Sequence, residues 1–407
     1  MLYFHVTSRL FFSTIDAIIA GAMNHASVNR HTKIVCTLGP ASSSPEVVEK
    51  MLKGGMDIAR FNLVHGTFEE HSRLISQVRL LSQELKLPTG ILLDIPGLKR
   101  RSGDVKAVFS QDLEFAVSQN ADFIALSFLS SARQVKEVKQ LLREMKAEIP
   151  VIVKIEQARA LEESGTMLDV GEGIMVARGD LALEISIEKV PLAQKQLIKE
   201  ANRRGKPVIT ATQMLESMVH SATPTRAEAA DVANAILDGS DALMLSEETA
   251  IGDYPVEATE MMARIALETE TTLPYDQILR EEWRDVLPEV NDATARAACQ
   301  IAYHVQARAI VAFTAGGTTA LRVSKYRPRQ PILAVTTSET IVRRLSLPWG
   351  VLPVIKPAPS NLEEVFGLAS EVALETGVAR RGDLVVITAG IPLNLPGSTN
   401  LVKVHSI

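Results

Sequence analysis

The sequence predicts an α/β protein: a (β/α)8 TIM barrel followed by a smaller C-terminal α/β domain. Three observations predict this fold. From Lys33 onward, short runs rich in β-branched residues alternate with longer segments of helical period. Nearly all of these runs are continuously apolar, which is typical of parallel strands covered on both faces. Eight such strand–helix units occupy roughly 250 residues, the usual size of one barrel.

The predicted barrel strands are Lys33–Thr37, Ile58–Asn62, Gly90–Asp94, Phe123–Ser127, Val151–Glu156, Gly173–Arg178, Pro207–Thr210 and Ala242–Ser246. Helical periodicity lies between most of them, at Glu69–Leu85, Ala132–Met145, Lys189–Arg204 and Arg226–Leu237, and a helix over Val256–Glu270 follows the last strand. We assign residues 31–275 to the barrel domain.

A second alternating series predicts a separate α/β domain over residues 290–407. Its strands are expected at Ala309–Phe313, Pro331–Thr336, Val351–Ile355, Asp383–Thr388 and Leu401–His405, and its helices at Ala293–Val305, Thr318–Tyr326, Ser338–Ser346 and Leu362–Glu375. Residues 1–30 are expected to form a disordered extension, or to precede a start at Met23, because Asp16 interrupts the apolar run that a signal peptide needs.

Composition argues against several function classes. Lysine and arginine number 43 and aspartate and glutamate 48, a net charge of −5, and no dense basic run offers a nucleic-acid or membrane surface. The two cysteines, Cys36 and Cys299, are far apart, which favours the reducing cytoplasm and argues against a disulfide scaffold or zinc site. No stretch reaches the ~18 consecutive apolar residues of a membrane span.

Polar side chains gather where the predicted strands end. Barrel enzymes carry their chemistry at the carboxyl ends of the strands. The strand ends here supply Arg60, Asn62, Asp94, Ser127, Lys154, Glu156, Asp180, Thr212 and Ser246. A ring of this kind is hard to explain as surface decoration, so it predicts an active site.

Glu156 and Asp180 are carboxylates on neighbouring strands, with no histidine or cysteine nearby in sequence. Oxygen-only ligands favour Mg²⁺ or Mn²⁺. Lys154 precedes Glu156 by two residues, so both side chains point to one face of the strand. A cation beside a divalent metal suits phosphoryl transfer; the alternative is a buried Lys–Glu pair that holds the barrel together.

The segment Ala177–Leu181 turns from strand to helix, and its free N–H groups could bind a carboxylate or phosphate beside Gly179. An ordinary glycine turn is the alternative. Thr212 and Ser246 could donate hydroxyls to an anion or simply cap local structure. Neither a G-x-x-x-x-G-K-[ST] loop nor a G-x-G-x-x-G motif is present, so no P-loop or Rossmann nucleotide site is predicted.

Seven segments, in order along the chain, resemble the pyruvate kinase family. They are Thr32–Ala41, Ile58–Asn62 with His65-Gly66, Val153–Glu156, Gly173–Leu181, Ala211–Met218, Pro224–Glu228 and Asp231–Asn234. The resemblance runs from about residue 31 to the C-terminus, where Gly397–Leu401 is similar to bacterial members. It implies transfer of a phosphoryl group from phosphoenolpyruvate to ADP, giving pyruvate and ATP, in a cytoplasmic homotetramer.

The resemblance also implies a role for each matching residue. Arg60, Lys154 and Thr212 are the catalytic candidates, and Arg60 and Arg101 would hold the phosphate of phosphoenolpyruvate. The amides around Gly179 and Asp180, with Thr212, would bind its carboxylate, and Ser127 ends a strand in the same ring. Glu156 and Asp180 would bind Mg²⁺ (or Mn²⁺).

Two further sites follow from the resemblance. Asn62, Asp94 and the backbone of Ile95 match a monovalent-cation corner, but Val64 replaces a serine and Lys99 a glutamate of K⁺-requiring relatives, so K⁺ is not expected to be required. In the C-terminal domain, the loop with Thr314, Gly316, Gly317, Thr318 and Thr319 matches a loop that binds effectors in many members. An ordinary turn is the alternative.

The chain departs from the family most clearly after the third strand. There the family inserts a lid domain, whereas here residues 94–103 lead almost at once to a helix around Ser110–Gln119, so we expect the lid to be absent near residues 99–105. Its loss would weaken ADP binding and admit water. Glu247 and Ala182 replace glycines of the family.

Two alternative functions are left open. One is Mg²⁺-dependent enolisation or decarboxylation of a keto acid, and the other is a pseudoenzyme that binds a metabolite or partner subunits.

Overall fold

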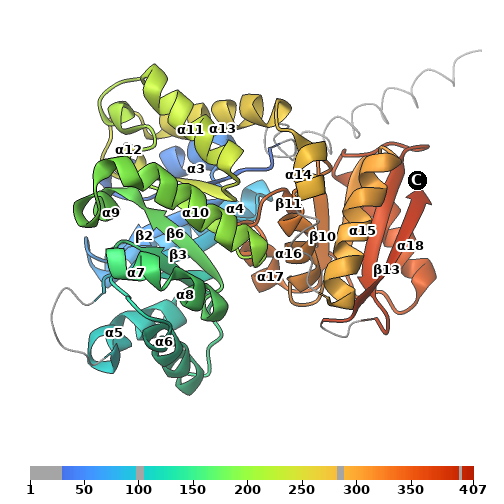
Figure 1. The fold of residues 1–407 in the computed structure, drawn as a ribbon, viewed down its shortest axis with the longest axis horizontal. Coiled ribbons are helices and arrows are strands. Elements are labelled where there is room, and N and C mark those ends of the chain that lie inside the picture. Colours follow the sequence, from blue (N-terminus) through green and yellow to red (C-terminus); the bar gives the residue numbers. More distant parts are fainter. Residues whose placement is uncertain (1–29, 98–104, 282–287, 394–396) are drawn as a thin grey trace, which may run out of the picture.

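The computed structural model describes residues 30–97, 105–281, 288–393 and 397–407, and it confirms the predicted fold class (Figure 1). Eight parallel strands close into a barrel in the order β1 to β8, and a five-stranded sheet forms a second domain. The predicted N-terminal extension, apart from Arg30, lies outside the described residues, as do Lys99 and Arg101.

The barrel strands are β1 (Lys33–Thr37), β2 (Ile58–Asn62), β3 (Gly90–Ile95), β4 (Phe123–Leu126), β5 (Val151–Ile155), β6 (Gly173–Ala177), β7 (Val208–Ala211) and β8 (Ala242–Leu245). The helices of this part are α3 (Pro45–Gly54), α4 (Phe68–Leu85), α5 (Val105–Ser118), α6 (Ala132–Glu144), α7 (Ala158–Glu162), α8 (Ser164–Val170), α9 (Arg178–Glu184), α10 (Val190–Arg203), α11 (Arg226–Asp238), α12 (Glu247–Ala250), α13 (Pro255–Thr271) and α14 (Tyr275–Glu281).

Local sequence signals set several helix ends. Thr67 and Glu70 form a capping box that begins α4, and Thr225 and Glu228 form another that begins α11. Gly239 ends α11 with a φ of 103°, a conformation that glycine adopts without steric cost. These ends place the loops that return the chain to the next strand.

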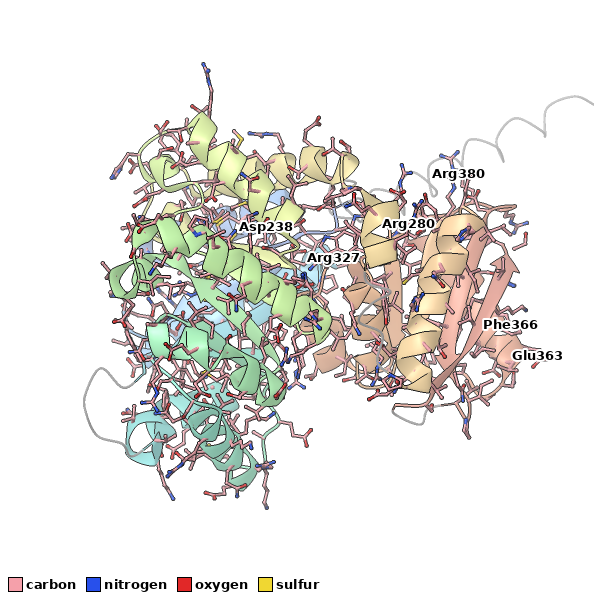
Figure 2. All side chains as sticks on the ribbon, in the orientation of Figure 1. Asp238, Arg280, Arg327, Glu363, Phe366 and Arg380 are labelled. Atoms are coloured by element: carbon pink, nitrogen blue, oxygen red, sulfur yellow. The ribbon has the colours of Figure 1, made fainter. Side chains whose placement is uncertain are left out.

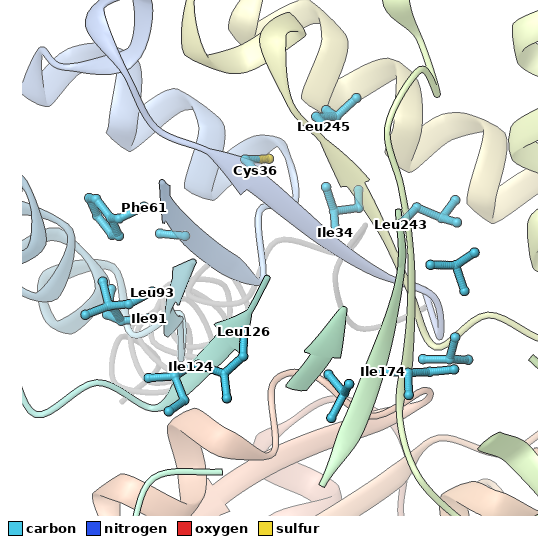
Figure 3. Packing of buried hydrophobic residues seen from close by; sticks show 14 of the residues in the cluster. Ile34, Cys36, Phe61, Ile91, Leu93, Ile124, Leu126, Ile174, Leu243 and Leu245 are labelled. Atoms are coloured by element: carbon cyan, nitrogen blue, oxygen red, sulfur yellow. The ribbon is translucent and has the colours of Figure 1, made fainter. Parts of the chain in front are cut away.

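The strands alternate between two apolar layers. Val35, Ile58 and Ile152 belong to the cluster that fills the barrel, whereas Ile34 and Cys36 belong to the larger cluster between the strands and the helices (Figure 3). The two-residue period of a strand produces this division. Because both faces of the strands are buried, each strand appears in the sequence as a continuous apolar run.

The C-terminal domain contains a mixed sheet in the order β11-β10-β9-β12-β13. Its strands are β9 (Ala309–Phe313), β10 (Ile332–Thr336), β11 (Val351–Ile355), β12 (Leu384–Gly390) and β13 (Thr399–Ser406), and β13 alone runs antiparallel to its neighbour. Its helices are α15 (Val290–His304), α16 (Thr318–Lys325), α17 (Glu339–Arg344) and α18 (Leu362–Glu375).

The C-terminal domain packs against the amino ends of the barrel strands. Leu347, which follows α17, belongs to the apolar cluster inside the barrel and packs there at the amino ends of the strands. Asp241, one residue before β8, pairs with Arg327 at 3.1 Å and accepts the N–H of Trp349 at 3.1 Å. Arg327 lies between the two parts of the molecule (Figure 2). The opposite end of the barrel, where the polar strand ends lie, is left uncovered by this domain.

Four of the predicted strands extend one residue further than the strands of the structure. Ser127, Glu156, Arg178 and Ser246 lie just past their strands, because the chain turns there and leaves the ladder. Helix α5 begins at Val105, earlier than the predicted Ser110. Among the described residues, no helix is both long and apolar enough to span a membrane.

Candidate active site

A buried network of charges lies at the carboxyl ends of β2 to β5. Arg60 donates to one oxygen of Asp94 through Nε at 3.0 Å and Nη2 at 2.7 Å, and to the hydroxyl of Thr37 at 2.7 Å. Lys154 donates to the other oxygen of Asp94 at 3.1 Å and to Ser127 at 2.6 Å. The structure therefore brings together Arg60, Asp94, Ser127 and Lys154, as the strand-end pattern predicts.

Glu156, one residue past the end of the strand that carries Lys154, completes this network. One of its oxygens lies 2.8 Å from Lys154 Nζ, and the other accepts the N–H of Phe128 at 2.9 Å. The two-residue spacing places both side chains on one face. Phe128 itself has a φ of 57°, in the left-handed region that residues other than glycine seldom adopt.

The neighbouring charges favour the charged forms of Lys154 and Asp94. Burial alone would lower the pKa of Lys154, but the carboxylates of Asp94 and Glu156 outweigh it and raise that pKa above its ordinary value. Burial alone would raise the pKa of Asp94, but Arg60 and Lys154 hold it below its ordinary value. Since Asp94 is only 1% exposed, it stays ionised because two cations surround it.

Asp94→Asn is expected to change the pH dependence of stability. A carboxyl with a lower pKa in the folded state stabilises the fold above its unfolded pKa, and loses this contribution as pH falls through the folded pKa. At neutral pH the variant should therefore unfold at a lower urea concentration than the wild type. The difference in free energy of unfolding between the two proteins should shrink below about pH 4. Urea titrations between pH 3 and 7 measure this; a difference that stays constant down to pH 3 would contradict the assignment.

A second group of predicted residues meets where β6 and β7 end. The N–H of Gly179 donates to the hydroxyl of Thr212 at 2.8 Å, and this hydroxyl donates to the carbonyl of Ala211 at 2.6 Å. Asp180 follows in the first turn of α9 and is exposed. Among the described residues, nothing hydrogen-bonds or pairs with the Asp180 carboxylate. One N–H group expected to be free, that of Gly179, is thus occupied by Thr212 in this structure.

Two residues that the sequence analysis missed support the strand ends. Glu248 is buried and accepts the N–H groups of Leu215 at 3.1 Å and Ser246 at 2.6 Å, so it ties the end of β8 to the loop after β7. Thr37 links Arg60 to the carbonyl of Leu245 at 2.9 Å. Only the position of Thr37 at a strand end could have signalled its role.

Ser246, the last member of the predicted ring, sits above β8. Its hydroxyl oxygen is buried and finds no hydrogen-bond partner among the described residues. A buried hydroxyl in that state is available to a bound ligand or water.

The monovalent-cation corner is only partly assembled from the predicted residues. The Asn62 oxygen accepts the N–H of Val64 at 3.2 Å, and Ile95 is buried in β3 with its carbonyl bonded to Ser127. Both oxygens of Asp94 already face Arg60 or Lys154. Of the described residues of this corner, Asp94 is therefore paired with protein cations, whereas Asn62 and the carbonyl of Ile95 accept main-chain N–H groups.

The predicted effector loop lies in the other domain. Thr314, Gly316, Thr318 and Thr319 line a pocket together with Lys356. Gly317 caps α16 with a φ of 88°. The Thr314 hydroxyl is buried and finds no partner in the described part of the chain. This loop does not belong to the barrel site.

The donor set at the barrel mouth fits a hard divalent ion. Glu156 directly follows β5, and Asp180 lies in the first turn of α9 after the neighbouring strand β6. The described residues hold no group of three or more His, Cys, Asp or Glu side chains that could enclose a metal. Mg²⁺ retains several waters and commonly takes only one or two protein carboxylates, with other ligands from substrate phosphates. The number of carboxylates matches that preference, and in this structure the two oxygens of Glu156 contact Lys154 and the N–H of Phe128.

Comparison with known proteins gives consistent matches. The family profile "Pyruvate kinase, barrel domain" matches residues 29–110 and 108–259, and "Pyruvate kinase, alpha/beta domain" matches residues 292–405. The chain is 36% identical to "Pyruvate kinase" of Staphylococcus aureus strain USA300 over 471 alignment positions, covering 93% of this chain and 80% of the relative. The protein of the same name from Staphylococcus epidermidis strain ATCC 35984 has the same identity and coverage.

Proposed function

The chain belongs to the pyruvate kinase family, and we propose that it transfers the phosphoryl group of phosphoenolpyruvate to ADP in an Mg²⁺-dependent reaction without a lid domain. The observation that supports this most directly is the network of Lys154 with Asp94, Ser127 and Glu156 beside Arg60. A fixed ammonium and a guanidinium, held at the barrel mouth, suit a phosphoryl group in transfer.

In the proposed reaction, the bond between phosphorus and the enol oxygen breaks while phosphorus bonds to a terminal phosphate oxygen of ADP. The contacts of Arg60 with Asp94 and Thr37 use three of its five N–H donors, and the proposal assigns the remaining two to the substrate phosphate. Lys154 stabilises the charge on the phosphoryl oxygens as it moves. Ser127 and Asp94 keep the ammonium in position.

The enolate that remains takes a proton at C3 to give pyruvate. We assign the substrate carboxylate to the region of Gly179 and Asp180, with Thr212 beside it. The Thr212 hydroxyl accepts the N–H of Gly179 and donates its only proton to the carbonyl of Ala211. Because a carboxylate only accepts hydrogen bonds, we propose that this proton turns from Ala211 to the substrate carboxylate on binding. Glu156 and Asp180 would hold Mg²⁺, which supplies charge neutralisation for the substrate oxygens when bound.

Three observations support the absence of the lid. Only seven residues, 98–104, separate Gly97 from Val105, where α5 begins. The barrel profile matches in two pieces that meet at residues 108–110. In the alignment to the S. aureus relative, 93% of this chain, about 379 residues, fills 471 positions, so about 92 positions of the relative have no counterpart here.

The loop after β3 also stays close to the barrel. A Cβ at Gly97 would lie 1.6 Å from the carbonyl oxygen of Ser127, so this position needs glycine and the chain leaves β3 in contact with the end of β4. Without a lid, the site is open to water, which weakens electrostatic contacts with the nucleotide phosphates. We therefore propose that ADP binding is impaired more than binding of phosphoenolpyruvate.

The reaction should proceed without K⁺. Lys99, which lies outside the described residues, replaces a glutamate of K⁺-requiring relatives, and Asp94 already faces Arg60 and Lys154. A fixed ammonium can replace the monovalent ion in the corner. Initial rates with KCl should equal those with tetramethylammonium chloride at the same ionic strength; strong stimulation by K⁺ would show that the corner needs an added ion.

Three further features are proposed from the family. They are a homotetrameric assembly, residence in the cytoplasm, and binding of an anionic effector at the loop of Thr314, Gly316, Gly317, Thr318 and Thr319. The pocket that includes this loop, with Lys356 on its wall, supports the last of these.

A lactate-dehydrogenase-coupled assay tests the proposed activity. Phosphoenolpyruvate, ADP and Mg²⁺ should together give pyruvate, and omission of any one should stop its formation. If pyruvate fails to form at any ADP concentration, the proposal is wrong.

A further inference from the structure

The turn that carries Thr212 is held in an unfavourable backbone conformation. Thr212 has a φ of 69° and Gln213 a φ of 54°, so two consecutive residues other than glycine lie in the left-handed region. A β-branched residue such as threonine seldom adopts this conformation. Such a turn persists only where its surroundings determine it, and it concentrates at functional sites.

The side chain of Arg178 supplies those surroundings. Its guanidinium donates to the carbonyls of Ala211 at 3.3 Å, Thr212 at 2.7 Å and Gln213 at 3.2 Å, and it contacts the sulfur of Met214 at 2.9 Å. It therefore contacts four consecutive residues of the turn. The first of them ends β7.

The guanidinium is itself anchored from the other side. Asp231 on α11 pairs with it at 2.6 Å, and Gln194 on α10 accepts from it at 3.4 Å. The Arg178 side chain is only 11% exposed. Side chains from two helices around the barrel thus hold the Arg178 guanidinium that hydrogen-bonds to the Thr212 turn.

The main chain of Arg178 connects the turn to the proposed substrate site. Arg178 begins α9 directly after β6, and its neighbour Gly179 donates to the Thr212 hydroxyl at 2.8 Å. One residue therefore holds the backbone of Thr212 through its side chain, while the next holds the hydroxyl of Thr212. Asp180, the proposed metal ligand, is the following residue.

We propose that Arg178 is a positioning residue that fixes Thr212 relative to Gly179 and Asp180, and thereby sets the geometry that receives the substrate carboxylate. This inference rests on the proposed function. The planar fork of arginine can reach three carbonyls and a carboxylate together, whereas the single ammonium of lysine cannot reproduce that arrangement. Arg178→Lys therefore keeps the charge and removes the geometry.

The test compares Arg178→Lys with Asp231→Asn and with Arg204→Lys, a control. Arg204 also pairs with two carboxylates, those of Asp169 and Glu200. It lies just past the C-terminal end of α10, away from the Thr212 turn. Arg178→Lys should lower kcat/KM for phosphoenolpyruvate about 100-fold, because small misplacements of a site cost that much, and leave KM for ADP unchanged. Asp231→Asn should also lower kcat/KM for phosphoenolpyruvate, but by a smaller factor. Arg204→Lys should have the same kcat/KM as the wild type.

Binding measurements separate this inference from the proposed reaction. Mn²⁺ is titrated by electron paramagnetic resonance with and without pyruvate, which needs no turnover. The tightening of Mn²⁺ binding by pyruvate should be lost in Arg178→Lys even if the wild type transfers no phosphoryl group. Unchanged pyruvate binding in a folded Arg178→Lys overturns the inference; if that variant does not fold, unchanged binding and kinetics in Asp231→Asn overturn it.

Discussion

Lys154→Met is expected to lower kcat for phosphoryl transfer by about 10³-fold or more, because the substitution removes a fixed charge aimed at the transferring group. Methionine has a similar length but no charge, so the shape of the site is largely kept. The ammonium contacts Asp94, Ser127 and Glu156 in the free protein, and all three lose a partner. Steady-state rates with saturating phosphoenolpyruvate and ADP measure the effect.

This variant also disturbs stability, so it needs a matched control. Removing one partner of a buried ion pair costs about 3–5 kcal/mol, because the remaining charge is left uncompensated. Lys325→Met provides the control: Lys325 is 7% exposed and pairs with Asp292 at 3.0 Å in the C-terminal domain. It should lose comparable stability and keep kcat. If Lys154→Met retained kcat within tenfold of the wild type, the role of Lys154 would be wrong.

Asp241→Ala is expected to destabilise the whole chain by about 3–5 kcal/mol, since it breaks a buried ion pair and leaves Arg327 without its carboxylate. Asp241 also accepts the N–H of Val208 at 3.0 Å and that of Trp349 at 3.1 Å, so its loss leaves two amides unsatisfied. Burial raises the pKa of Asp241, and Arg327 with these amides opposes that shift. Urea unfolding followed by tryptophan fluorescence measures the change.

The matched control for this prediction is Asp276→Ala. Asp276 pairs with Arg280 at 3.1 Å on the exposed face of α14, where an ion pair contributes less than about 1 kcal/mol. A loss at Asp241 no larger than that at Asp276 would show that the domain contact contributes little to stability. Because Leu347 packs inside the barrel, both domains should unfold in one transition.

The fold was predictable because its signals are local. Strands β1, β2, β9 and β11 have the bounds that the apolar runs predict, since Gly, Pro and polar residues mark their ends. The pairing of Lys154 with Glu156 was also predictable, because a spacing of two residues puts side chains on one face of a strand.

Other parts of the site depend on which strands become neighbours. Arg60 meets Asp94 only because β2 and β3 pair with Asn62 opposite Asp94. Leu347 enters the barrel from the second domain, and Arg178 reaches carbonyls more than thirty residues away. A single sequence carries no periodic signal for such contacts, and main-chain acceptors leave no trace in residue type.

One measurement tests the central claim most directly: the initial rate of pyruvate formation as ADP is raised, at saturating phosphoenolpyruvate and Mg²⁺. The S. aureus relative, about 36% identical, serves as the reference under the same conditions. We predict turnover that saturates only at a much higher ADP concentration than in the relative, with a kcat within tenfold of it. An equal KM for ADP would contradict the account of the missing lid, and no turnover at any ADP concentration would contradict the proposed activity itself.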